Sequence, residues 1–474
     1  MCVMAVVVAI VAVALVVWGA VFLRHTGLVG GSLAVLFVGS CFGHVFYHVS
    51  VGPIPVTADR VLLAVLLGAF LICRHVGRTE RWRPDAGDLL LVAFVSVLAV
   101  ATFAHDWRAD DFRPVAVLLF FYVLPFVLYV IARETPLSER AVTGILTALA
   151  AFGVYLAVTA VCERLQIRWL IFPSYIASEE YGEFLGRGRG PLLNPAANGL
   201  FLCVGLFSLL MFWPRVSRSG KMLLSLLVAV YLAGVFCTLT RCVWAAAALG
   251  LFLIACLTLP GRWRIAFALT VTLSGLVFVA TQWDALKAFK RDKNVSVVEM
   301  TRSAELRPIL AYVAWQMFLD RPLAGCGLAQ YQQESARYLS DRSTTMPLER
   351  ARGYVQHNVV LGLLAETGAV GAGLYLALMV LWFRSAWMLW RRPPRPLPAR
   401  QFGLVMLASL AAFLAIGMFQ DLTIMVMVNM LMFFLVGTLR SLVARNEPAT
   451  AHRPDTRRLP AAAPRAETLS ALPT

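Results

Sequence analysis

The sequence has little charge and none of the common motifs of soluble enzymes. Only 14% of its 474 residues are charged and 60% are hydrophobic, whereas soluble domains rarely exceed about half apolar residues. The nine cysteines show no CxxC pairing or other metal-ligand spacing. The sequence also lacks a P-loop, a GxSxG nucleophile elbow and an HExxH pair. The chain must therefore bury its apolar surface in lipid, and nucleotide-, serine- or zinc-dependent catalysis is not expected.

Long apolar runs recur along the whole chain. A helix needs roughly 17–25 mainly apolar residues to cross a bilayer, and thirteen runs meet or approach this length. They predict an all-α fold, a polytopic bundle of about 12–13 transmembrane helices. The runs cover residues 3–23, 28–47, 56–73, 88–104, 115–132, 141–161, 198–214, 221–239, 242–259, 263–281, 358–383, 403–419 and 422–439.

The net charge of +16 is distributed unevenly. Basic clusters fall in alternate connections, which is the positive-inside pattern of membrane proteins and argues against a nucleic-acid surface. These connections and the C-terminus should face the cytoplasm and, with thirteen spans, the N-terminus should face outward. The first run lacks the basic start and the A-x-A-like exit of a signal peptide. The clusters are Arg24, Arg74/Arg78/Arg81/Arg83, Arg133/Arg140, Arg215/Arg218/Lys221, Arg262/Arg264, Arg384/Arg391/Arg392/Arg395/Arg400 and the tail from Arg440.

Most cysteines lie inside the apolar runs, where we expect them to act as small packing residues. Cys326 is different because it falls in a long outer connection. It could pair with Cys162 or Cys242, although nothing in the sequence requires a disulfide.

Two outer connections are long, one over about residues 163–197 and one over about 282–356. Long ordered connections between membrane helices are usually functional. Within the second, apolar residues recur at helical spacing between Leu306 and Phe318, and the pattern stops before Arg321. We expect an amphipathic helix on the outer surface, over the mouth of the bundle, because this segment is too short and one-sided to span.

Three arginines stand at the outer ends of apolar segments. Arg241 interrupts an apolar run over residues 222–259 and marks a hairpin tip. It either reaches to the membrane interface or binds phosphate through two parallel hydrogen bonds. Arg187 and Arg189 alternate with glycines and precede Asn194 at a helix start. This arrangement suits an anion, and a flexible solvated loop is the alternative.

His357 and Asn358 lie where the large outer connection enters an apolar run. An imidazole titrates near neutral pH and can accept a hydroxyl proton, although a lone interfacial histidine can also be structural. Glu366 follows nine residues later, roughly 13 Å deeper and on nearly the opposite helix face. We therefore expect no direct dyad with His357. Glu366 should brace a neighbouring helix or be protonated.

These motifs together resemble the O-antigen ligase and polymerase superfamily of bacterial inner-membrane glycosyltransferases. The resemblance rests on their order and on the large connection before the histidine-bearing helix, and it covers roughly residues 185–440. The first five or six spans match only as generic apolar helices. The segments that carry the resemblance are residues 189–198, residues 239–244, Arg307 with residues 322–327, and residues 357–368.

The resemblance implies a glycosyltransferase that moves a glycan from a polyprenyl-diphosphate carrier, such as undecaprenyl diphosphate, to an acceptor hydroxyl. The reaction belongs to lipopolysaccharide or cell-surface polysaccharide biosynthesis and occurs at the periplasmic face of the inner membrane. Arg241 would stabilise the leaving diphosphate, and His357 would take the acceptor proton. The implied partners are the lipid-linked glycan donor, a lipid or glycan acceptor and the bilayer, with no nucleic acid, cofactor or metal. The implied substrate-binding residues are Arg187, Arg189, Arg307, Asn194 and Asn358.

The sequence suggests three parts: N-terminal transmembrane helices over residues 1–162, a catalytic-type core over 163–440 that includes the periplasmic loop 282–356, and a disordered basic cytoplasmic tail over 441–474. A ligase is favoured over a polymerase by the segment from His357 to Gly368. A transporter or flippase of lipid-linked glycans is the alternative from another class, and it would place polar groups near mid-membrane. A membrane scaffold would leave the outer arginines and histidine unexplained.

Overall fold

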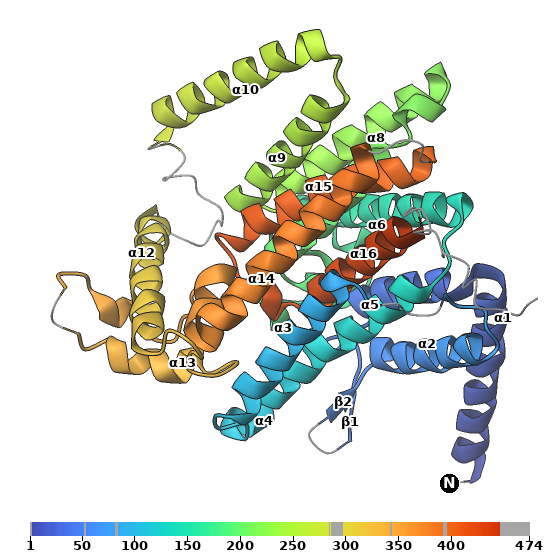
Figure 1. Cartoon of the computed structure of the whole chain (residues 1–474), viewed down its shortest axis with the longest axis horizontal. Helices are drawn as coiled ribbons and strands as arrows, with labels where there is room; N and C mark the ends of the chain where they lie inside the picture. Colours follow the sequence, from blue (N-terminus) through green and yellow to red (C-terminus); the bar gives the residue numbers. More distant parts are fainter. Residues whose placement is uncertain are drawn as a thin grey trace, which may run out of the picture.

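The protein is a bundle of helices in the computed structural model, which describes residues 2–51, 54–80, 84–283, 285, 297–341, 344–391 and 396–445 (Figure 1). The predicted all-α polytopic fold is confirmed. A short antiparallel hairpin was not predicted; its strands are β1 (Val49–Val51) and β2 (Ile54–Val56). Among the predicted features, Arg81, Arg83, Arg392, Arg395 and the tail beyond Arg445 lie outside the described residues.

The helices follow one another with short connections, apart from two long loops. The α-helices are α1 (Cys2–Cys41), α2 (Ala58–His75), α3 (Ala86–Phe103), α4 (Ala109–Val117), α5 (Leu124–Glu134), α6 (Glu139–Leu165), α7 (Pro195–Leu210), α8 (Arg218–Cys237), α9 (Arg241–Thr258), α10 (Gly261–Thr281), α12 (Val297–Asp320), α13 (Tyr331–Glu334), α14 (Val359–Arg391), α15 (Leu397–Gly417) and α16 (Val426–Arg445). A π-helix, η1 (Leu118–Val123), joins α4 to α5. Short 3-10 helices are η2 (Arg168–Leu170), η3 (Ser174–Ala177), η4 (Glu179–Tyr181), η5 (Gly190–Leu192), η6 (Trp213–Arg215), η7 (Ser335–Tyr338), η8 (Leu348–Ala351) and η9 (Leu422–Ile424).

Eleven described helical segments are long and apolar enough to cross a membrane, so this is a multi-pass membrane protein with two fewer candidate spans than the thirteen predicted. The first two predicted spans correspond to the two halves of α1, which is interrupted by non-helical backbone at Gly27; the N-terminal half turns away from the bundle (Figure 1), and the candidate span counted there begins at Val21. The third forms α2, but Asp59, Arg60 and Arg74 lower its apolar character.

One buried apolar cluster extends from Leu28 to Val443 and unites the first helices with the last. Helices α7, α15 and α16 are its centre and are almost wholly buried. In contrast, α10 has no buried residue, packs against α9 and leans away from the bundle (Figure 1). The functional division at residue 162 stays a prediction, because the two parts share this core. Helix α16 ends at Arg445, five residues into the predicted tail.

The two ends of the bundle differ in chemistry. At one end Arg440 binds Asp85, and Arg133 lies 3.4 Å from Asp85 and 3.5 Å from Asp88, so ion pairs join α3, α5 and α16. At the other end lie the two long loops, over residues 166–194 and 321–358, with the α8–α9 turn. We call this second end the loop end. The predicted outer connections gather there.

The expected amphipathic helix is α12, and it is longer than predicted (Figure 1). Its apolar face does not lie against lipid. The face packs into a second buried cluster, with the loop that follows it in the sequence. This cluster consists of Ile309, Leu310, Val313, Ala314, Met317, Cys326, Tyr331, Leu339, Leu348, Ala351 and Ala365.

Candidate active site

Arg241 is the first residue of α9, directly after a tight turn that begins where α8 ends at Cys237. Thr240 is the N-cap residue, and Leu239 adopts a left-handed backbone conformation with φ of 49°. The turn is therefore as short as the sequence predicts. The side chain of Arg241 is half-buried at the loop end of the bundle.

Arg187 stabilises this turn through hydrogen bonds. Its side chain is buried, with 5% of the residue exposed. Its Nη2 donates a hydrogen bond to Thr240 Oγ1 at 2.6 Å, and its Nε donates to the carbonyl of Thr238 at 3.3 Å. The substrate-binding role predicted for Arg187 stays a prediction, but these contacts make it a support for the turn that presents Arg241.

Arg189 is turned into its own loop and is fully buried. Its guanidinium donates to the carbonyls of Ile176 at 2.8 Å, Glu183 at 2.5 Å and Tyr181. Glu163 lies beneath it and accepts from the backbone N–H of Gly190 at 2.8 Å. These contacts show that the Arg189 guanidinium stabilises the fold of its own loop. The solvated-loop alternative does not describe it, and neither does a guanidinium open to substrate.

Asn194 and Asn358 both cap helices. Asn194 Oδ1 accepts from the backbone N–H groups of Ala196 and Ala197, at 2.9 and 3.1 Å, at the start of α7. Asn358 Oδ1 accepts from Leu361 N at 2.9 Å at the start of α14, so each satisfies a backbone donor that would otherwise lack a partner. Asn358 also donates through Nδ2 to the carbonyl of Met418 at 3.1 Å, which ties α14 to the end of α15.

His357 immediately precedes this cap and has a left-handed backbone with φ of 51°. Such a conformation is uncommon outside glycine and needs support from its surroundings. Its neighbour Gln356 is buried and donates a hydrogen bond to Asp421 Oδ2 at 2.8 Å. Asp421 in turn accepts from the backbone N–H and the hydroxyl of Thr423. The imidazole is thus carried on a fixed segment between α14 and the α15–α16 connection.

Arg307 of α12 brings Arg241 and His357 into one electrostatic site. Burial lowers the pKa of Arg307, and the nearby charge of Arg241 lowers this pKa further, although Cys242 acts in the opposite direction. Burial also lowers the pKa of His357, and the charge of Arg307 adds to the effect. A lowered pKa favours the neutral imidazole, the form that can accept a proton. Three segments far apart in sequence therefore influence one another electrostatically here.

Glu366 anchors the large loop. Its Oε1 accepts from Tyr331 N at 3.3 Å, and its carbonyl accepts from Gly327 N at 2.9 Å. Helix α14 breaks two residues later at Gly368, with φ of 64°. The helix is continuous from Val359 to Glu366, so it is the large loop that folds back to reach this residue. Glu366 braces α13 through Tyr331, as expected for a residue that supports a neighbouring helix.

Asp421 and Gln356 were not among the predicted site residues. A signal for Asp421 exists in the sequence, since it is the only charged residue between 403 and 439. Burial raises its pKa, and the hydrogen bonds from Thr423 oppose this change. Gln356 carries no comparable signal, because an amide beside a histidine has no characteristic spacing.

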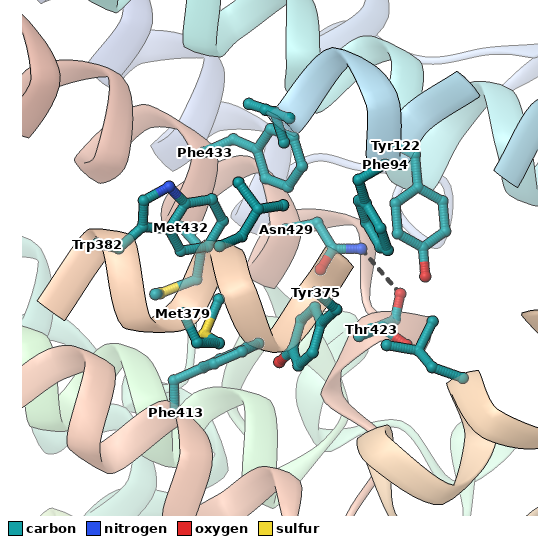
Figure 2. A pocket seen from close by; sticks show the side chains of 13 residues that line it. Phe94, Tyr122, Tyr375, Met379, Trp382, Phe413, Thr423, Asn429, Met432 and Phe433 are labelled. Atoms are coloured by element: carbon teal, nitrogen blue, oxygen red, sulfur yellow. Dashed lines mark hydrogen bonds between the residues drawn. The ribbon is translucent and has the colours of Figure 1, made fainter. Parts of the chain in front are cut away.

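A cavity lies between α3, α14, α15 and α16, and Figure 2 shows aromatic and sulfur-containing side chains pointing into it. Its volume is about 30 Å³, which suits one or two water molecules rather than a polyprenyl tail. Asn429 donates to the carbonyl of Thr423 at 2.8 Å at its edge (Figure 2). None of the residues lining it is an arginine or a histidine, so this cavity is separate from the candidate active site.

The eight cysteines from Cys41 to Cys326 are free, so Cys326 pairs with neither Cys162 nor Cys242. Among the same residues, no group of three or more histidine, cysteine or acidic side chains could hold a metal ion.

Comparison with known families matches one segment of this chain. Residues 223–376 match the family model described as O-Antigen ligase, which is about a third of the sequence. The matched segment extends from α8 into α14 and contains Arg241, Arg307 and His357. No curated protein matches the chain. Over residues 223–376, this match confirms the resemblance to the O-antigen ligase superfamily predicted from the motifs.

Proposed function

We propose that this protein transfers a glycan from a polyprenyl-diphosphate carrier to an acceptor hydroxyl. The observation that carries the proposal is the meeting of Arg241, Arg307 and His357 at the loop end, inside the segment that matches the O-Antigen ligase family. Two guanidiniums suit a diphosphate, and a neutral imidazole suits a hydroxyl proton. The reaction requires both groups in one place.

In the proposed reaction the acceptor oxygen attacks the anomeric carbon of the donor sugar. The bond from this carbon to the phosphate oxygen breaks, and its electron pair leaves with the diphosphate. Arg241 and Arg307 stabilise the negative charge that develops on the leaving group. His357 takes the proton of the acceptor hydroxyl. Attack opposite the leaving group inverts the anomeric centre, and the scheme needs no metal or cofactor.

The remaining predicted residues fit positioning roles in this scheme. Arg187 supports the Arg241 turn, and Arg189 folds the loop beside it. Asn194 caps α7, Asn358 fixes the start of α14, and Glu366 holds the large loop. Each keeps a site element in place without needing to touch the substrate.

We further propose that the loop end faces the periplasm of a bacterial inner membrane. The alternating basic connections favour this orientation. A ligase acting in lipopolysaccharide or cell-surface polysaccharide biosynthesis is favoured over a polymerase by the segment from His357 to Gly368. The acceptor distinguishes the two: a lipid-linked glycan repeat for a polymerase, and a different lipid or glycan hydroxyl for a ligase.

Reconstitution tests the proposal. The purified protein in nanodiscs is mixed with a labelled undecaprenyl-diphosphate glycan and, in parallel reactions, with lipid A core or unlabelled lipid-linked repeat as acceptor. The wild-type protein should form a glycosidic bond with one acceptor. His357→Ala and Arg241→Ala should each reduce transfer by about 10²-fold or more, because each removes a group that acts in the transition state.

Two control variants match these changes. His75 is exposed on α2, and Arg350 of the large loop is paired with Glu305 at 3.3 Å on the surface. Their alanine variants should retain transfer. Full transfer by His357→Ala and Arg241→Ala would refute the assigned roles. Movement of lipid-linked glycan across vesicles without a new glycosidic bond would favour the flippase alternative.

A further inference from the structure

Phe419 is an exposed aromatic residue beside the candidate active site. It follows the end of α15, and 48% of its surface is exposed. Arg307 Cζ lies 5.5 Å from the centroid of its ring, within the range of a cation–π contact. The ring therefore contacts the same guanidinium that is proposed to bind the donor diphosphate.

The backbone that carries Phe419 is fixed relative to His357. Phe419 N donates to the carbonyl of Ile416 at 2.9 Å, and the preceding residue, Met418, accepts from Asn358 Nδ2 at 3.1 Å. Asp421, two residues later, holds Gln356 at 2.8 Å. The ring thus sits on a segment bonded to both neighbours of His357, and it occupies a defined position in the site.

Chemistry limits what can lie next to this ring. The sugar that reacts is bonded directly to the diphosphate, so any group a few ångströms from the phosphate-binding guanidinium is within reach of that sugar. The face of an aromatic ring is negative, and sugar C–H bonds carry partial positive charge. A sugar can therefore lie against the exposed part of the Phe419 ring while Arg307 contacts the phosphates.

We propose that Phe419 forms a sugar-binding subsite for the first sugar of the donor, the one bonded to the diphosphate. This inference rests on the proposed function. It assigns Phe419 a part in recognising the sugar, whereas Arg241 and Arg307 recognise the diphosphate whatever sugar it carries. The subsite therefore contributes to selection among lipid-linked glycans.

Two other roles for the ring make different predictions. A ring that only supports Arg307 through the cation–π contact would affect binding of the diphosphate with or without sugar. A ring that only anchors α15 at the membrane interface would affect neither. The sugar subsite alone affects the sugar-bearing ligand selectively.

The test compares two probes in nanodiscs: undecaprenyl diphosphate and undecaprenyl-diphosphate N-acetylglucosamine. Dissociation constants are measured for the wild type, Phe419→Leu, which keeps an apolar side chain without a ring, and Phe419→Tyr, which keeps the ring. Phe278→Leu on α10 is the matched control, because Phe278 is also exposed (56%) but belongs to a helix with no buried residue. Arg307→Gln tests the diphosphate site itself.

We expect Phe419→Leu to weaken binding of the sugar-bearing probe by about three- to ten-fold and to leave the bare diphosphate unchanged. Phe419→Tyr and Phe278→Leu should bind both probes as the wild type does. Equal weakening of both probes by Phe419→Leu, or no weakening of either, would overturn the subsite. Unchanged binding of both probes by Arg307→Gln would instead count against the diphosphate site of the proposed function. Failure of the wild type to bind either probe would overturn both proposals.

Discussion

Two glycines lock the large loop onto α14, and replacing them should uncouple the loop from the site. Gly325 and Gly368 have left-handed φ values of 70° and 64°. A Cβ on Gly325 would lie 2.3 Å from the carbonyl carbon of Glu366, and a Cβ on Gly368 would lie 2.3 Å from that of Leu323. Both contacts are with backbone, which cannot rotate away, so the two segments would have to separate.

The cost follows from the contacts that separation breaks. An alanine in a left-handed conformation costs about 1–2 kcal/mol. Cys326 N donates to the carbonyl of Ala365 and Gly327 N to that of Glu366, both at 2.9 Å, and each bond contributes about 0.5–1.5 kcal/mol. Gly325→Ala or Gly368→Ala should therefore weaken docking of the loop by about 2–5 kcal/mol. Because α12 leads directly into this loop, Arg307 should lose its position.

Hydrogen exchange measured by mass spectrometry gives the local readout, and the reconstituted transfer reaction gives the functional one. Exchange over residues 322–331 should accelerate in both variants, and transfer should fall by up to about 10²-fold, as expected for misplaced reacting groups. Gly373→Ala is the control on the same helix, because a Cβ there meets nothing within 4 Å. If Gly325→Ala and Gly368→Ala showed the same hydrogen exchange and the same transfer rate as Gly373→Ala, the proposed coupling between the large loop and α14 would be refuted.

Three further changes test the supports of the site. Thr240→Val should leave the Arg187 guanidinium without its 2.6 Å acceptor and lower stability by about 1–3 kcal/mol, whereas Thr240→Ser should resemble the wild type in thermal unfolding. Arg189→Met should cost about 3–5 kcal/mol, since it leaves buried carbonyl groups without donors; an unchanged melting temperature would contradict this. Because burial and Arg307 lower the pKa of His357, the acidic limb of the pH profile of kcat/KM should lie below about pH 6.5, and Arg307→Gln should move it upward. An acidic limb above this pH in the wild type would exclude the imidazole as the base.

The sequence predicts those parts of the fold that depend on one simple property, such as the length of an apolar run or the charge of a connection. Apolar runs of membrane length predict spanning helices, and the basic connections predict which ends share one side. The length rule separated the apolar runs on either side of Gly27, where the helix is interrupted, but it missed the interruption at Gly368 inside a predicted span. A glycine in an apolar run is compatible with either a straight or a broken helix, so tertiary contacts decide.

The sequence grouped the candidate site residues at one end of the bundle, but it could not give the direction of their side chains. Arg187, Arg189 and Arg241 have the same chemistry and lie at similar positions relative to apolar runs. Arg187 and Arg189 are nevertheless buried, at 5% and 0% exposed; Arg187 binds a backbone carbonyl of the α8–α9 turn, and Arg189 binds carbonyls of its own loop. Whether a guanidinium faces a ligand or a carbonyl depends on where the loop folds, and the local sequence does not contain that information.

Left-handed backbone occurs in each of the segments that meet at the loop end. Leu239, Ala329 and His357 have left-handed φ values of 49°, 59° and 51°. Each belongs to one of the segments that meet at the loop end: the turn before Arg241, the large loop and the start of α14. Such conformations cost of order 1–3 kcal/mol each and persist only where surrounding contacts impose them.

A buried or half-buried polar side chain supplies that contact in every case. Arg187 bonds both sides of the turn at Leu239, Glu366 bonds the segment that contains Ala329, and Asp421 bonds the residue before His357. The arginine and the carboxylates suit this task, because hydrogen bonds to charged groups are shorter and roughly twice as strong as those between neutral groups. Part of what resembles substrate-binding chemistry in the sequence is therefore the framework that holds Arg241 and His357 in position.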